Sequence, residues 1–142
     1  MDKLDIIRIE TALGDWGELP AKFQRLSPDQ QEHYLTCQGY QSVTDLLAHV
    51  TAWWERGMLL IKQFQVDAGF LSPEVDVDKF NAEAVAKARG KSGDEILLAF
   101  EAARQRFCGL VLELETEKPI DPRISRQIDM ELIAHYQEHK II

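Results

Sequence analysis

The sequence of 142 residues predicts an all-α protein, a four-helix bundle with short extra helices in the connections. Apolar residues recur every three or four positions over four long stretches, which is the spacing of one helix face. No stretch alternates apolar and polar residues between turn signals, as a strand would. Since no internal repeat or low-complexity tract divides this length, residues 1–142 are expected to form a single domain.

The first helical stretch is expected to run from residue 2 to about residue 26. Gly17 and Pro20 lie inside it, and they predict either a kinked helix or two short helices that meet near Gly17. A serine followed by a proline then predicts a short helix at 28–35, because these residues are typical of an N-cap and a first helical position. A loop is expected at 36–41.

The second half of the chain carries the remaining long helices. A serine-capped helix with a wide apolar face is expected at 42–66, followed by a connection and a modest helix at 76–89. The next helix begins at Ser92 or Asp94 and keeps strict three-and-four spacing to Leu114. After two prolines, residues 123–142 are expected to form the final helix.

Two histidines of the final helix, His135 and His139, lie four residues apart and therefore on one helix face, where both imidazoles can point at a single ion. They continue the apolar positions of Ile128 and Leu132, and Ile142 follows in the same register. A packed helix normally carries leucine at such positions. Two interpretations remain: core histidines satisfied by hydrogen bonds, or ligands of a metal ion.

A third imidazole is available on another long helix, where His49 lies on the flank of the apolar face. His33, in the short polar helix, is expected to face water. One ligand from one helix and an i, i+4 pair from a facing helix is a common way to build a metal site inside a bundle. Three neutral imidazoles leave open coordination positions and suit a divalent ion, Zn²⁺ first, with Ni²⁺, Fe²⁺ and Mn²⁺ also compatible.

Several residues near the candidate ligands have weaker signals. Asp45 and Glu131 each precede a candidate ligand by four residues and could orient an imidazole, although caps and exposed helix faces also carry such carboxylates. Trp53 could wall a pocket or belong to the core. Glu138 is a weak catalytic candidate, since residues 135–139 spell the H-x-x-E-H pattern of inverted zinc proteases. Those enzymes need an acidic ligand far downstream, whereas three residues follow His139.

Charge and composition exclude several classes of function. The chain has 16 basic and 24 acidic residues, a net charge of −8, so a nucleic-acid partner is not expected. No apolar run reaches membrane-spanning length and the N-terminus lacks the pattern of a signal peptide, which together predict a cytoplasmic protein without membrane contact. Cys37 and Cys108 form no disulfide framework or ligand motif and are expected as reduced thiols.

Two stretches carry a resemblance to a known family. The stretch SVTDLLAHVTAWWE, residues 42–55, followed much later by HYQEH at 135–139, resembles the DinB-like (damage-inducible, YfiT-like) superfamily. The segment DKFN at 78–81, followed by a capped helix, is similar to its ClbS/DfsB-type branch. The resemblance covers essentially the whole chain. It implies a four-helix bundle, often a homodimer, that binds a divalent metal through His49, His135 and His139.

Relatives in that superfamily include thiol-dependent S-transferases, a maleylpyruvate isomerase and hydrolases. The leading hypothesis is therefore a metal-dependent enzyme of the hydrolase or thiol S-transferase kind that acts on a small-molecule substrate. The alternative is a non-enzymatic, stress-related bundle that binds a metal or a ligand without turnover.

Overall fold

The computed structural model describes residues 4–115 and 119–142, and every regular element within these ranges is helical. The prediction of an all-α protein is confirmed. In chain order the elements are α1 (Ile6–Gln24), α2 (Pro28–Gln38), α3 (Val43–Val66), α4 (Val77–Ala88), α5 (Gly93–Glu115), α6 (Pro122–Ile128), the π-helical turn η1 (Asp129–Ala134) and α7 (His135–His139).

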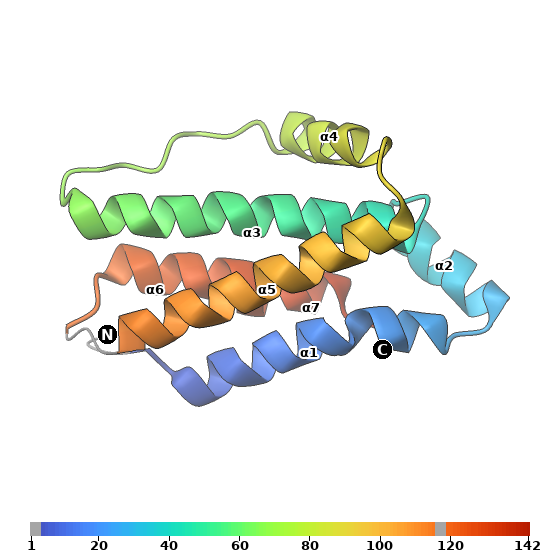
Figure 1. The fold of residues 1–142 in the computed structure, drawn as a ribbon, viewed down its shortest axis with the longest axis horizontal. Coiled ribbons are helices and arrows are strands. Elements are labelled where there is room, and N and C mark those ends of the chain that lie inside the picture. Colours follow the sequence, from blue (N-terminus) through green and yellow to red (C-terminus); the bar gives the residue numbers. More distant parts are fainter. Residues whose placement is uncertain (1–3, 116–118) are drawn as a thin grey trace.

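The helix α3 is the central element of the fold. It packs on α5, α4, α6 and η1, while α1 packs on α5 and η1. In Figure 1, α4 lies along the outer side of α3, and the α6–α7 segment lies along its opposite side. The terminal segment is thus held between α3 and α1, an arrangement compatible with the predicted four-helix bundle.

Large aromatic side chains join these elements in the core. The rings of Trp16 in α1 and Trp54 in α3 meet edge to face at 5.2 Å, and Trp54 also stacks on Phe100 of α5 at 5.2 Å. All three side chains are almost completely buried. Aromatic contacts of this geometry add to the free energy already gained by burying the rings, so this cluster fixes three helices relative to one another.

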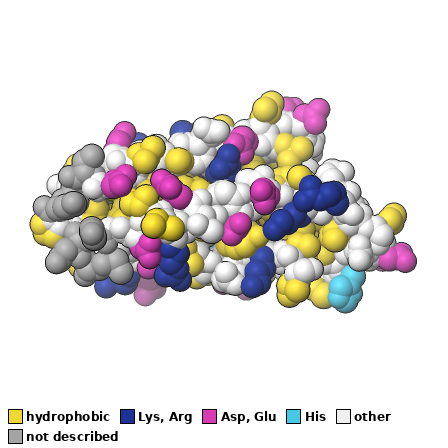
Figure 2. Space-filling model, turned by 90° about the horizontal axis from the view of Figure 1, so that it is seen from below, with side chains coloured by type: hydrophobic (Ala, Val, Ile, Leu, Met, Phe, Trp, Pro, Cys, Tyr) yellow, Lys and Arg dark blue, Asp and Glu magenta, His cyan; other side chains and the backbone are white. Residues whose placement is uncertain are grey.

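The surface carries both signs of charge. On the face shown in Figure 2, acidic and basic side chains are interspersed among apolar ones. Among the described residues, no helix combines the length and the apolarity that crossing a bilayer would require.

The N-terminal half agrees with one of two expected arrangements and differs from the sequence prediction at one helix end. The helix α1 runs without interruption, so the pair of short helices meeting near Gly17 is excluded and a single helix remains. Pro20 removes only one hydrogen bond, and the buried side chains on either side keep the helix packed. The helix α2 continues three residues further than expected, to Gln38, because Gly39 adopts a left-handed φ of 80° and its N–H closes the last turn.

The final helix differs from the expectation at its end and in its middle. It ends at His139, and Ile142 is exposed rather than part of the apolar face. Between Asp129 and Ala134 the hydrogen bonds span five residues instead of four, and the N–H of His135 bonds to the carbonyl of Met130. Such widened turns are rare and are frequent at functional sites.

Two buried tryptophans hold this widened turn in place. Where five-residue spacing returns to four-residue spacing, one carbonyl in the helix is left without its usual partner. The carbonyl that follows Met130 is that of Glu131, and it accepts a hydrogen bond from the indole N–H of Trp54 at 3.1 Å. The next carbonyl, of Leu132, accepts from the indole of Trp16 at 2.8 Å. The core therefore satisfies the backbone that the π turn exposes.

The Trp54→Phe variant should lose about 1–3 kcal/mol of unfolding free energy, because the carbonyl of Glu131 would be left buried without a donor. Urea unfolding measures this loss. The neighbouring Trp53→Phe is the matched control: its indole is only half-buried, and water can replace the lost hydrogen bond, so the loss should be under about 1 kcal/mol. Equal losses in the two variants would contradict this role of Trp54.

Candidate metal centre

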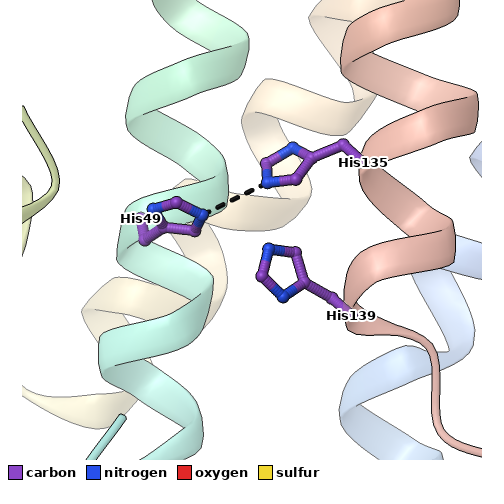
Figure 3. A group of neighbouring side chains, drawn as sticks. All are labelled: His49, His135 and His139. Atoms are coloured by element: carbon purple, nitrogen blue, oxygen red, sulfur yellow. Dashed lines mark hydrogen bonds between the residues drawn. The ribbon is translucent and has the colours of Figure 1, made fainter. Parts of the chain in front are cut away.

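Three histidines from two elements converge in the interior, as Figure 3 shows. His49 projects from α3, and His135 and His139 project from consecutive turns of α7. One nitrogen of each ring lies within 4.8 Å of the corresponding nitrogens of the other two. The three residues are 5, 9 and 6% exposed, respectively. The convergence inferred from their spacing is therefore present in the structure.

The tautomer of His49 follows from its neighbours. Its Nδ1 lies 2.9 Å from Oδ1 of Asn81, and the same Oδ1 accepts the indole N–H of Trp53 at 2.7 Å. Because an indole nitrogen can only donate, the amide atom between them is the oxygen, and Nδ1 of His49 must carry a proton. Nε2 of His49 therefore presents its lone pair to the other two rings.

His139 is fixed by the same logic. Its Nδ1 lies 2.7 Å from Oε1 of Gln38, whose Nε2 donates to the carbonyl of Glu138 at 3.1 Å. A carbonyl can only accept, so the amide orientation is determined, and Nδ1 of His139 is the protonated nitrogen. Its Nε2 is buried and has no hydrogen-bond partner in the described part of the chain.

The third ring adds another unsatisfied nitrogen. Nε2 of His135 lies 3.2 Å from Nε2 of His49, and since the latter is an acceptor, the former carries the proton. Nδ1 of His135 is then a bare, buried acceptor without a partner among the described residues. Unpaired buried nitrogens cost folding free energy, and a cation among the three rings would use the idle Nε2 lone pair of His139.

Burial also keeps these rings uncharged. It lowers the pKa of His49 to about 4, although the hydrogen bond to Asn81 opposes the shift. It lowers the pKa of His135 to about 3, with further lowering by the charges of His139 and His49, and it lowers that of His139 to about 4. The neutral imidazole is the form that binds metals, so the cluster is ready for an ion at neutral pH.

A pocket of about 290 Å³ leads to the cluster. Two of the histidines, His49 and His135, line it together with Trp53 and Asn81. Trp53 therefore lies in the pocket lining, where it packs against Phe80 with ring centroids 4.3 Å apart. The site is buried within the bundle yet has an approach for a small molecule.

The two carboxylates singled out in the sequence have other partners. Asp45 is paired with Arg89 at 3.2 Å, and Glu131 accepts from the amide of Gln127 at 3.2 Å. No hydrogen bond joins either carboxylate to an imidazole in the described ranges. Glu138 is exposed and contributes to the pocket lining.

The residues that do orient the imidazoles, Asn81 and Gln38, were missed by sequence reasoning. Asn81 lies on α4, and no spacing connects it to His49. Gln38 fell in a segment expected to be a loop. The remaining candidates behave as expected or lie apart: His33 is exposed, and neither Cys37 nor Cys108 belongs to the histidine cluster.

Comparison with protein-family models, with curated proteins and with solved structures gives no match. The chemistry of the site must therefore be argued from its own residues.

Metal-free protein should lose stability as the pH falls from 7 to 5. An unfolded chain protonates histidine near pH 6.5, whereas the three buried rings stay neutral down to about pH 4, so unfolding takes up three protons. Glu131, whose pKa burial raises to about 7, takes up its proton in the folded state and offsets one of them. The net uptake approaches about two protons near pH 5, where the slope approaches about 2.7 kcal/mol per pH unit, and it is far smaller near pH 7, where the histidines of the unfolded chain are mostly neutral.

Urea unfolding of chelator-treated protein at pH 5, 6 and 7 measures this slope. The Glu131→Gln variant removes the opposing proton, so its slope should be steeper by about 1.4 kcal/mol per pH unit. Stability that stays constant between pH 7 and 5 would show that the cluster is not held neutral.

Proposed function

We propose that this chain is a divalent-metal-dependent enzyme of the hydrolase or thiol S-transferase kind, built as a DinB-like four-helix bundle. The observation that carries the proposal is the convergence of His49, His135 and His139 with two buried, unpartnered nitrogens beside a pocket. Core histidines would instead have their nitrogens satisfied by the protein. The packing of α1, α3 and α5 with the α6–α7 segment supports the bundle.

The donor set favours particular ions. Three imidazole nitrogens without a thiolate suit Zn²⁺ or Ni²⁺, and Fe²⁺ or Mn²⁺ are compatible. Such an ion supplies Lewis acidity that makes water or a thiol nucleophilic near neutral pH. A closed structural zinc site would need a fourth protein ligand, and the described part of the chain brings no cysteine or carboxylate into the cluster.

The chain's own residues orient and shield the site. Asn81 and Gln38 accept hydrogen bonds from the Nδ1–H groups of His49 and His139, respectively, and thereby direct both Nε2 lone pairs inward. Partners of this kind fix ring orientation and raise ligand basicity. The indole of Trp53, held by the same Asn81 oxygen, forms an aromatic wall that limits water and gives a substrate an apolar surface.

The near-complete burial of the cluster favours a second candidate, a bundle that binds a metal without turnover. The His135→Ala variant separates the two. In an enzyme, the variant loses activity while a folded bundle survives. In a structural site, the metal is part of the folding free energy, so the variant loses much of its stability.

Metal binding should stabilise the protein against unfolding. At a free Zn²⁺ or Ni²⁺ concentration 100 times Kd, the wild-type chain should gain about 2.7 kcal/mol, and His135→Ala should gain far less because one of three ligands is gone. Thermal unfolding with and without metal, together with elemental analysis of the purified protein, measures this. His33→Ala is the matched control, because His33 is exposed on α2 and should leave the gain unchanged. A wild-type chain that gains nothing would refute the proposal.

Removing either orienting amide should weaken metal binding about 10- to 100-fold without removing a ligand. Asn81→Ala and Gln38→Ala would each leave one imidazole free to rotate or change tautomer. Competition with a chelator of known affinity measures the change in Kd. Gln41→Ala serves as control, since Gln41 is bonded to Arg89 and to no imidazole. Unchanged affinity in both variants would mean that the rings are held by packing alone.

A further inference from the structure

Glu131 carries a buried carboxyl group that has no ion-pair partner among the described residues. The residue is 4% exposed, and its single side-chain hydrogen bond runs from the amide of Gln127 to Oε2. In the described ranges no cation forms an ion pair with it, although the charge of Arg56 acts on it from a distance and opposes the rise of its pKa, and no hydrogen bond is made by its Oε1. Burial raises the pKa of this carboxyl to about 7. A group in this position reduces stability unless it has another use.

The facing helix α3 has a glycine, Gly57, at the position where a side chain would collide with this carboxyl. A Cβ atom at Gly57 would lie 2.1 Å from Oε2 of Glu131, closer than any real contact. Glycine in the middle of a helix such as α3 costs about 1 kcal/mol relative to alanine. A buried carboxyl and a glycine inside a helix, both unfavourable for stability, thus lie next to each other, which is typical of a functional site rather than of a packed core.

The carboxyl lies in the same pocket as the metal centre. Along α3, His49, Trp53 and Gly57 succeed one another by one turn, and Glu131 precedes His135 by about one turn on the facing segment. The pocket of about 290 Å³ is lined by Glu131 as well as by His49 and His135. A ligand anchored at the histidines would therefore have Glu131 within reach of its other end.

The charge of the lining narrows the kind of ligand. Glu131 and Glu138 are its only charged side chains among the described residues, and it contains no lysine or arginine. The lining also includes His135, a buried residue whose Nδ1 has no hydrogen-bond partner among the described residues. An acidic wall beside a cation site disfavours anionic substrates and favours a donor of hydrogen bonds.

On the basis of the proposed function, we infer that Glu131 is the specificity-determining residue of the pocket. Its Oε1 accepts a hydrogen bond from an amino or other N–H group of the substrate. The substrate then carries a group that approaches the metal centre at one end and an amine a few bonds away. Charge-assisted hydrogen bonds of this kind are about twice as strong as neutral ones, so the residue selects amines over carboxylates.

Three small thiols that differ in their end group test this assignment on the Co²⁺-loaded full chain at pH 8. Cysteamine, 2-mercaptoethanol and 3-mercaptopropionate share a two-carbon spacer and end in an ammonium, a hydroxyl and a carboxylate, respectively. The thiolate-to-cobalt absorption band gives the Kd of each thiol. The readout is the ratio of Kd between variant and wild type, in which the intrinsic acidity of each thiol cancels.

In Glu131→Gln, the Kd of cysteamine should rise about tenfold, that of 2-mercaptoethanol should stay within about twofold, and that of 3-mercaptopropionate should fall. Glu55→Gln is the control, because Glu55 is exposed, paired with Arg106 and outside the pocket lining, so the cysteamine value should change less than about threefold. Gly57→Ala, which displaces the carboxyl of Glu131, should also weaken cysteamine more than 2-mercaptoethanol.

A cysteamine ratio within twofold in Glu131→Gln would overturn the assignment and leave Glu131 as a structural carboxyl, while the metal site itself would stand. If the wild-type chain takes up no Co²⁺, the proposed function fails instead, so the two failures are distinguishable. Circular dichroism of each variant establishes that it is folded, and Gly57→Ala provides the same test with the wild-type Glu131 retained.

Discussion

The hydrogen bonds from two indoles to the carbonyls of Glu131 and Leu132 determine the geometry on which the candidate site depends. They stabilise a helical turn that is one residue wider than normal. The last residue of that turn is followed directly by His135, so the direction in which the two terminal histidines project depends on the widened turn. The aromatic core and the site are therefore parts of one arrangement: the same tryptophans that join α1 and α3 also fix the register of the terminal segment.

The electrostatics of the interior have a common cause as well. Burial withdraws water from three imidazoles and one carboxyl, and it lowers the pKa values of the former while raising that of the latter. All four groups are therefore driven toward their uncharged forms in the absence of an ion. A divalent cation would keep the rings in this neutral form, since it binds their lone pairs, whereas it would favour the ionised form of the carboxyl nearby. The protonation of Glu131, unlike that of the rings, therefore depends on whether a cation is present.

The sequence predicted the parts of this structure that follow from periodicity. Three-and-four spacing located the long helices, and the i, i+4 step of His135 and His139 with a third imidazole at His49 located the cluster. The π turn was not predictable, because it depends on indole donors more than 70 residues distant in sequence, and neither was the exposure of Ile142. The amides of Asn81 and Gln38 were missed for the same reason: their partners lie 32 and 101 residues away, and only tertiary contact reveals them.

The shared amide oxygen of Asn81 has a practical consequence. It accepts hydrogen bonds from both His49 and Trp53. Asn81 belongs to α4, a helix that packs mainly on α3 and lies at the outside of the molecule. A change in the ring of His49 is therefore transmitted through one atom to the docking of an outer helix and to a half-buried indole. The position of the Trp53 indole is therefore coupled to the ring of His49 through a single shared oxygen.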